Sequence, residues 1–307
     1  MVRRVLEKGD RDEESPSDHG STAVVSARTI RVDERSGVLN PANLERYGAL
    51  WLDPDPAVTE VVGQYWHVRW HLDPGETIPQ TNISLPAITL SIEEGDVPAT
   101  FVVTGVQSRA WRRDISGRGA VFALRLTPAG FSVLSDLSPA SVADATVPVT
   151  ADLDERLHDL LASIASVPSP ESRARAANAA IGARLRERPL SDEARLAKAV
   201  AAELTARVRS RAGGALAEQF GTSERAVQRA LKQTLGHGPK WISRWIRLQE
   251  VARVLAGGEG VSAAALAVDL GYSDQAHLVN DFRLATGLTP AAYARSVTAF
   301  SGGADPD

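Results

Sequence analysis

A short pattern occurs twice in this sequence, first as Phe220-Gly-Thr-Ser-Glu-Arg-Ala-Val-Gln-Arg-Ala-Leu-Lys232 and then as Leu270-Gly-Tyr-Ser-Asp-Gln-Ala-His-Leu-Val-Asn-Asp-Phe-Arg283. The copies lie about 50 residues apart, the second contains one extra residue, and each leads into Gly-x-x-Pro, at Gly236 and at Gly287. Repetition at this period predicts that one structural unit is used twice.

Each copy is typical of two short helices joined by a tight turn. Gly221 and Gly271 stand where a helix commonly ends in the left-handed conformation, which glycine adopts without strain. Ser223 follows at the position of an N-cap for the second helix, and Ser273 is its counterpart in the second copy. A hydroxyl at this position can accept a hydrogen bond from a backbone N–H that has no partner within the helix. Apolar residues recur at helical spacing, at Leu216, Ala217, Phe220, Val227, Ala230 and Leu231 and at Leu266, Ala267, Leu270, Leu278 and Phe282. The pattern predicts a helix-turn-helix motif, whose second helix is presented to the DNA major groove.

On these motifs, residues 191–298 resemble the DNA-binding domain of the AraC/XylS family of transcription regulators. The likeness is most specific in residues 271–293, Gly-Tyr-Ser-Asp-Gln-Ala-His-Leu-Val-Asn-Asp-Phe-Arg-Leu-Ala-Thr-Gly-Leu-Thr-Pro-Ala-Ala-Tyr, which look like the family's signature segment. The resemblance implies a sequence-specific regulator that binds double-stranded DNA, with a cupin-like sensor domain before the DNA-binding domain. It also leaves room for a small-molecule effector, a homodimer and contact with RNA polymerase.

Composition narrows the class of protein. A chain of 307 residues with 43% hydrophobic residues is expected to fold as two globular domains. The absence of cysteine excludes disulfides, thiolate metal sites and cysteine nucleophiles, and with them the methyl-accepting DNA-repair proteins that share this kind of DNA-binding domain. The N-terminal residues lack an apolar segment of signal-peptide length, and no apolar run is long enough to span a membrane. We therefore expect a cytoplasmic protein.

Charge is distributed unevenly along the chain. The net charge is −4, yet residues 206–300 carry twelve Lys or Arg against seven Asp or Glu, which makes that part +5. The C-terminal part is therefore basic, whereas the rest of the chain is acidic. This distribution is typical of a DNA-binding domain attached to a second domain that does not bind DNA.

The remaining segments suggest an α+β multidomain chain. Residues 1–36 are charged and turn-rich and are expected to be a flexible tail with a short strand near 23–30, and 299–307 are a second tail. Residues 37–150 alternate short β-type runs with turns, which predicts a cupin-like antiparallel β-barrel that senses a ligand or dimerises. The expected strands are 64–71, 88–92, 100–106, 110–115 and 121–126.

Residues 151–190 are predicted to form a helical linker. Leu153, Leu157, Leu160, Leu161 and Ile164 form one apolar stripe, and small residues from Ala174 to Leu185 form a second. The second stripe is suited either to a dimer seam or to packing on the barrel. After it, Ser191 should cap a helix that supports the first module, and residues 239–256 should form a long helix joining the two modules.

The polar faces of the reading helices supply the candidate DNA contacts. The resemblance to the AraC/XylS family implies that Arg225, Gln228 and Arg229 occupy base-facing positions in the first reading helix, and that Gln275 and Asn280 do so in the second. These residue types suit the role, because arginine can pair with guanine and glutamine or asparagine with adenine. Candidate phosphate contacts are Ser223, Lys232, Lys240, Arg244, Arg247, Arg283 and Arg295. Because Asp274 and Asp281 flank the second set, where carboxylates would repel phosphates, we expect the first module to dominate. Asp274 could still help to cap the N-terminus of its helix.

The predicted barrel is not expected to be an enzyme. His67 and His71 lie four apart on one strand, about 13 Å from each other at strand rise, too far to chelate one metal ion. We therefore predict no catalytic residues, no metal and no cofactor. Trp66, Trp70 and Trp111, together with Trp51, either line a ligand pocket or fill the core.

Two other functions stay open at this stage. One is a metal-dependent cupin enzyme with a DNA-binding appendage, which would require a bound metal. The other is a protein-interaction module whose helical half binds another protein. The leading hypothesis remains a transcription regulator that contacts two successive major grooves of DNA.

Overall fold

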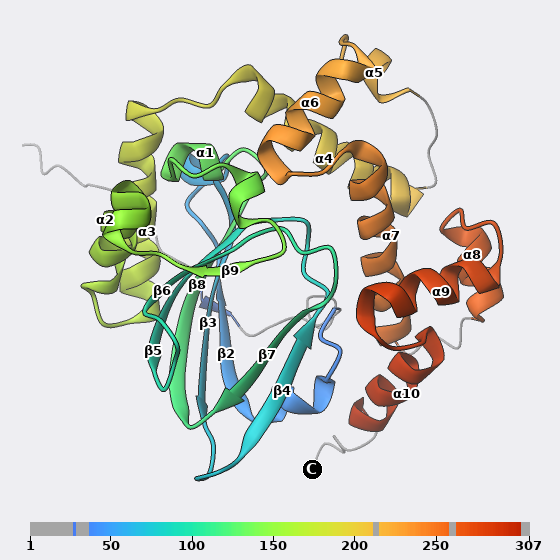
Figure 1. Ribbon diagram of the computed structural model, residues 1–307, viewed down its shortest axis with the longest axis horizontal. Coiled ribbons are helices and arrows are strands. Elements are labelled where there is room, and N and C mark those ends of the chain that lie inside the picture. Colours follow the sequence, from blue (N-terminus) through green and yellow to red (C-terminus); the bar gives the residue numbers. More distant parts are fainter. Residues whose placement is uncertain (1–26, 29–36, 211–214, 258–261, 302–307) are drawn as a thin grey trace, which may run out of the picture.

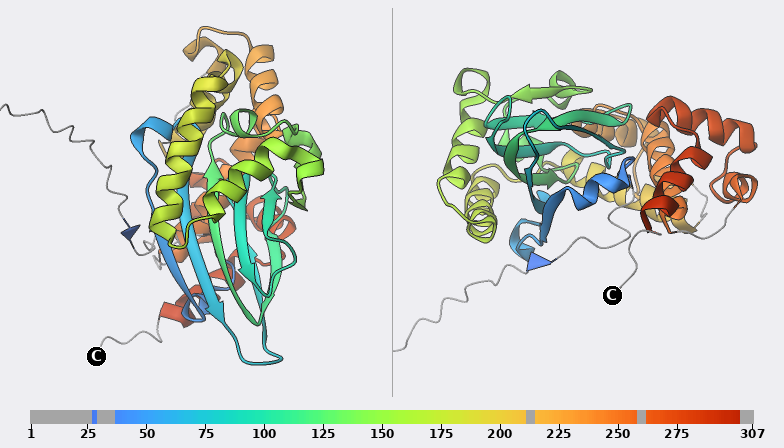
Figure 2. Two further views of the ribbon diagram at one scale, coloured as in Figure 1. Left: turned by 90° about the vertical axis from the view of Figure 1, so that its left-hand side faces the viewer. Right: turned by 90° about the horizontal axis from the view of Figure 1, so that it is seen from below.

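The computed structural model describes residues 27–28, 37–210, 215–257 and 262–301. A β-rich N-terminal part lies beside a helical C-terminal part, as Figures 1 and 2 show. Most of the expected N-terminal tail and residues 302–307 fall outside the described ranges. The second tail was predicted to start at 299, but the last helix continues to Ser301.

The N-terminal part contains two antiparallel sheets. The larger has the strand order β1-β2-β3-β8-β5-β6-β9 and the smaller pairs β4 with β7. Their bounds are β1 Ala27–Arg28, β2 Tyr47–Leu52, β3 Val62–His71, β4 Thr77–Asn82, β5 Thr89–Gly95, β6 Phe101–Thr104, β7 Trp111–Ser116, β8 Arg118–Leu126 and β9 Thr146–Pro148. All five strands predicted between residues 64 and 126 are present. The described strands pair in an open order, so the expected barrel is observed as two sheets.

The larger sheet has two buried faces of different character. On β3 and β8, Tyr65, Phe122 and Leu124 point into the main hydrophobic core and are fully buried. The alternate residues of the same strands, such as Trp66 and Ala123, point to the opposite face, where they line a pocket. Because both faces are covered, β8 carries an unbroken apolar run from Ala120 to Leu124.

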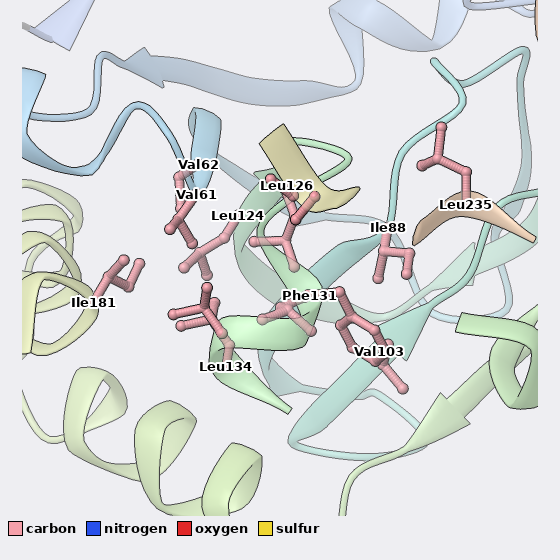
Figure 3. Close-up of a cluster of buried hydrophobic side chains, with 14 of the residues drawn as sticks. Val61, Val62, Ile88, Val103, Leu124, Leu126, Phe131, Leu134, Ile181 and Leu235 are labelled. Carbon is pink, nitrogen blue, oxygen red and sulfur yellow. The ribbon is translucent and has the colours of Figure 1, made fainter. Parts of the chain in front are cut away.

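Helices α1 (Phe131–Leu134), α2 (Ala151–Ala165) and α3 (Pro170–Glu187) pack around the core side of this sheet. Three short 3₁₀ segments, η2 (Pro41–Glu45), η3 (Pro56–Val58) and η4 (Pro139–Val142), complete the loops. Figure 3 shows Ile181 of α3 and Leu235 of the C-terminal part in the same core as Leu124 and Phe131.

The two apolar stripes predicted for residues 151–190 pack against other parts of the same chain. Leu157, Leu160, Leu161 and Ile164 are buried as predicted, but Leu153 is 40% exposed. The backbone leaves helical geometry at Asp154 (φ −159°, ψ 94°), so the first turn of α2 does not continue the stripe. In the second stripe, on α3, Ala174, Ala177 and Ile181 are fully buried, and Leu185 is partly buried against the same core. This stripe therefore rests on the β domain and is not available as a dimer seam.

Asp154 caps the main part of α2 and fixes the loop before it. One carboxylate oxygen accepts from the backbone N–H of Leu157 at 2.9 Å, and the other accepts from Ser135 Oγ at 2.5 Å and the Asp136 N–H at 2.9 Å. Burial opposes ionisation, but these hydrogen bonds together hold the pKa of Asp154 below its ordinary value. The ionised carboxylate therefore stabilises the fold at neutral pH.

Replacing Asp154 with Asn should lower the free energy of unfolding by about 2 kcal/mol, because an amide can accept on one side only and leaves buried donors unpaired. Urea denaturation measures this loss. Asp152→Asn changes an exposed carboxylate in the same helical turn and should cost less than about 0.5 kcal/mol. Since the folded-state pKa is depressed, the advantage of the native protein over Asp154→Asn should persist at neutral pH and shrink as the pH falls through that pKa. A difference that stays constant into strong acid would contradict the assignment.

The C-terminal part consists of seven helices among the described residues. They are α4 Asp192–Ser210, α5 Leu216–Gln219, α6 Glu224–Leu235, α7 Pro239–Ala256, α8 Ala263–Asp269, α9 Gln275–Thr286 and α10 Pro290–Ser301. α4 packs against α6 and α7, and α10 packs against α7. Figure 1 shows the pair α5–α6 at one end of α7 and the pair α8–α9 at the other.

The turn chemistry of both modules follows the predicted pattern, with one correction. Gly221 (φ 58°) and Gly271 (φ 70°) are left-handed, and Ser223 caps α6 by accepting from the Ala226 N–H. In the second module Asp274, not Ser273, is the N-cap of the reading helix. The extra residue of the second copy therefore lies between Gly271 and the cap. Beyond it the two reading helices correspond at an offset of 51, and each has 12 residues.

Each module also packs against the β domain. The main core continues from the sheet into the first module through Val227, Leu231 and Leu235. Leu39 and Ile83 of the β domain join the core of the second module, and the Ala110 N–H donates to the Ala285 carbonyl at 2.7 Å. The two modules and the β domain therefore share packed cores in the described part of the chain. None of the described helices has the length and apolarity needed to cross a bilayer.

Candidate DNA interface and an internal pocket

The candidate base-reading residues project from the two reading helices into solvent. Arg225, Gln228 and Arg229 on α6 are exposed, and Gln275 and Asn280 on α9 are exposed as well. The burial of Val227, Ala230 and Leu231 on the opposite side of α6 fixes this orientation. At the offset of 51, Val279 occupies the place that Gln228 has in the first module. The first module therefore offers more groups that can hydrogen-bond to bases.

Arg229 has a partner within the chain. Its guanidinium lies 3.6 Å from the carboxylate of Glu193 at the start of α4, and both side chains are about half exposed. A pair of this kind is weak because water screens it, so a stronger acceptor such as a guanine edge can displace Glu193.

The candidate phosphate contacts fall into two groups. Lys232, Lys240, Arg283 and Arg295 are exposed, and Ser223 is exposed although its hydroxyl caps α6. Arg244 and Arg247 are half-buried and are engaged within the chain. Exposure and charge leave the first group available to a phosphate backbone.

Arg244 and Arg247 hold the second module to α7. Arg244 Nε donates to Asp281 Oδ1 at 2.7 Å, and the Tyr272 hydroxyl donates to Asp281 Oδ2 at 3.3 Å. Arg247 lies over the Tyr272 ring at 5.1 Å and donates to the Gly271 carbonyl at 3.2 Å. Burial, followed by the Asp281 charge, raises the pKa of Tyr272, so its hydroxyl keeps its proton and acts as a donor. Two of the seven predicted phosphate contacts are thus placed where they support the fold.

The two acidic residues of the second module also differ from expectation. Asp281 was expected to flank the reading face and repel phosphate, but it is 8% exposed and paired with Arg244. Asp274 is exposed and accepts from the His277 N–H at 2.7 Å, a hydrogen bond that lowers the pKa of its carboxyl. Only Asp274 therefore places negative charge at this surface.

An internal pocket of about 460 Å³ lies on the second face of the larger sheet. Its floor and walls include all four tryptophans considered from the sequence, Trp51, Trp66, Trp70 and Trp111. Trp51 and Trp66 are cross-strand neighbours whose rings stack at 6.4 Å. Trp70 is nearly buried and donates through Nε1 to the Ser116 carbonyl, so it forms part of the wall.

The roof of this pocket was not found from the sequence. It is formed by Thr205 and Arg209 of α4 and by Ile246, Gln249 and Glu250 of α7. These residues follow the floor strands by more than 75 positions, and no local pattern links them to the sheet. The pocket therefore lies between the β domain and the helix that joins the two modules.

Both histidines considered from the sequence, His67 and His71, lie on β3 as predicted. Burial and the nearby Arg173 charge lower the pKa of His67, so its imidazole is held neutral. Among the residues that the structure describes, no group of three or more His, Asp or Glu side chains could hold a metal ion.

Two family models match the chain. Residues 216–296 match a family described as a helix-turn-helix domain, and residues 51–148 match a domain of unknown function, DUF6597. No curated protein is similar enough to be matched.

Among solved structures, ToxT from Vibrio cholerae O395 is 10% identical with a TM-score of 0.40, covering 83% of this chain and 99% of that one. Wild-type ToxT of strain SCE256, described as bound to an unsaturated fatty acid, is 10% identical with a TM-score of 0.38. That match covers 73% of this chain and 92% of ToxT.

Proposed function

We propose that this chain, a DNA-binding transcription regulator with an AraC-type helix-turn-helix domain at residues 216–296, places its two reading helices in successive major grooves of one duplex. The first module reads bases through Arg225, Gln228 and Arg229. The second module contributes Gln275 and Asn280 and reads fewer positions. The pocket of the β domain holds a small-molecule effector that controls this binding.

One observation carries the proposal. Two reading helices of equal length, each with an exposed polar face, are attached to opposite ends of the continuous helix α7. α7 has 18 residues, so its axis is roughly 27 Å long at 1.5 Å per residue. Successive major grooves on one side of B-DNA lie about 34 Å apart. With the reading helices attached at its ends, a helix of this length suits that separation.

Affinity is expected to depend on salt, because the exposed cations Lys232, Lys240, Arg283 and Arg295 would displace counterions from phosphates. A mobility-shift assay on the DNA upstream of the chain's own gene, with and without competitor DNA, tests the proposal. Retention of the complex against unrelated competitor supports a sequence-specific regulator. Complete loss to competitor would show non-specific DNA binding, and the absence of any complex without competitor would favour the interaction-module alternative.

The effect of Arg229→Ala separates base reading from phosphate contact. If Arg229 reads a guanine, its removal should cost about 1–3 kcal/mol at one base position and relax specificity there. Competition binding against a library of single-base variants of a selected site measures this. Arg175→Ala removes an exposed arginine from α3 and should leave the binding profile unchanged. An equal loss on every sequence would make Arg229 a phosphate contact.

The proposal assigns no catalytic step and no resident metal. The alternative of a metal-dependent enzyme makes the opposite prediction, namely a stoichiometric metal in the purified protein by elemental analysis. A homodimer remains part of the proposal, but it needs a surface other than the buried stripe of α3. Contact with RNA polymerase is likewise proposed for the exposed surface of the complex on DNA.

A further inference from the structure

The pocket between the β domain and α7 has an aromatic floor that suits a flat ligand. Trp51 and Trp66 lie side by side on neighbouring strands with their rings 22° from parallel. Trp111, on β7, faces the same space and is fixed by a hydrogen bond from Nε1 to Thr146 Oγ1 at 3.2 Å. Rings held in this way offer apolar faces with little freedom to move, so a rigid aromatic ligand loses little entropy on binding.

The charge around the pocket is unbalanced in favour of cations. The charged side chains that line it are four arginines and two glutamates: Arg113, Arg125, Arg209, Arg253, Glu93 and Glu250. Arg113 pairs with the buried Glu93 at 2.8 Å, and Arg253 pairs with the buried Glu250 at 2.6 Å. The lining therefore carries a net charge of +2, which an anionic ligand would reduce.

Among Arg113, Arg209 and Arg253, Arg209 can turn most easily toward a ligand. Its Nε lies 3.6 Å from Glu250, a longer separation than in the other two pairs, and its side chain is 62% exposed. Beside it, the buried Gln249 Oε1 has no hydrogen-bond partner among the described residues. The roof thus offers a guanidinium fork that matches a carboxylate and a free acceptor for a ligand hydroxyl or N–H.

We propose that this pocket binds a small aromatic carboxylic acid. Its ring lies against Trp51, Trp66 and Trp111, and its carboxylate pairs with Arg209 in the roof. Because the roof belongs to α4 and α7, the ligand joins the β domain directly to the helix that separates the two reading modules. An effect of the ligand on DNA binding through α7 rests on the proposed DNA-binding function, whereas ligand binding itself does not.

Calorimetric titration of the full chain with naphthoate tests the ligand class, with naphthamide as the matched neutral ligand and decanoate as the matched aliphatic acid. Naphthoate should bind about tenfold tighter than either, which corresponds to about 1.4 kcal/mol. Equal binding of naphthoate and naphthamide would rule out anion recognition. Equal or tighter binding of decanoate would rule out aromatic selectivity, and no binding of naphthoate would overturn the proposal.

Two arginines of α4 provide a matched pair of variants. Arg209→Gln should weaken naphthoate about tenfold while leaving naphthamide unchanged. Arg195→Gln removes an arginine of similar exposure (56%) that does not line the pocket, and it should bind both ligands as the native chain does. Parallel losses in both variants would show that Arg209 does not contact the ligand.

Coupling is tested by repeating the naphthoate titration with the chain saturated by a duplex selected from random sequence. If the ligand acts on α7, its affinity should change when DNA is bound, and DNA affinity should change by the same factor. Identical naphthoate affinities in both titrations would refute coupling. Naphthoate binding without any DNA binding would refute the proposed function alone, and DNA binding without naphthoate binding would refute the ligand site alone.

Discussion

Trp245→Ala is expected to lower the free energy of unfolding by about 4 kcal/mol, in the range found when large aromatic side chains are removed from cores. Trp245 lies in the middle of α7 and is 1% exposed. Its ring stacks on Trp241 at 5.3 Å, and its Nε1 donates to the Ser84 carbonyl of the β domain at 2.7 Å. The substitution would therefore leave a cavity in the second module and an unpaired carbonyl at the contact between domains.

Two further variants separate these contributions. Trp245→Phe keeps most of the ring but loses the donor to Ser84, so it should cost about 1–2 kcal/mol. Trp241→Ala removes a half-buried ring on the same helix and should cost less than Trp245→Ala. Chemical denaturation followed by circular dichroism gives all three values. If Trp245→Phe is as stable as the native chain, the stability of α7 does not depend on the contact with Ser84.

The helix-turn-helix modules could be predicted in detail because their signals are local. A left-handed glycine, a capping side chain and helical apolar spacing all lie within 20 residues of one another. The bounds of α7 were predicted for the same reason, since Pro239 opens it. The error at Ser273 has a simple origin: the sequence shows one extra residue but not on which side of the cap it lies. In the structure it precedes Asp274.

Three strands, β2, β4 and β9, were not predicted from the sequence. β4, Thr77–Asn82, contains Pro79 and polar residues, which is tolerated because β4 and β7 form a two-stranded sheet in which Pro79 lies on an edge strand. On its other side β4 meets the chain at its end, through the bridge between Asn82 and Val38. β2, Tyr47–Leu52, includes Gly48, and β9 has only three residues. Their positions depend on partners far away in the chain.

The charged residues show a second limit. Arg244, Arg247 and Asp281 have the residue types and helical positions of DNA contacts, yet they bind one another or the backbone of the second module. A sequence does not reveal whether a charge is already paired across a tertiary contact. The same limit applies to the pocket, whose tryptophans could be named but whose roof on α4 and α7 could not.

Changing the spacing between the two half-sites of a selected operator should have the largest effect on DNA binding. Inserting five base pairs rotates one half-site to the opposite side of the duplex. The chain would then hold only one module in place, and the loss of bivalent binding should weaken affinity on the order of 100-fold. Fluorescence anisotropy with the altered duplexes measures the change, and a spacer of unchanged length but altered sequence is the control.

Inserting ten base pairs distinguishes a rigid connection from a flexible one. The half-sites then face the same side again but lie about one helical turn, or 34 Å, farther apart. A flexible linker would recover much of the affinity, whereas α7, continuous over 18 residues and packed against α4 and α10, cannot lengthen. We therefore expect the ten-base-pair insertion to bind as weakly as the five-base-pair insertion. If affinity recovers with the ten-base-pair insertion, α7 does not set the spacing of the half-sites. If affinity is unchanged by the five-base-pair insertion, the second module contributes nothing measurable to DNA binding.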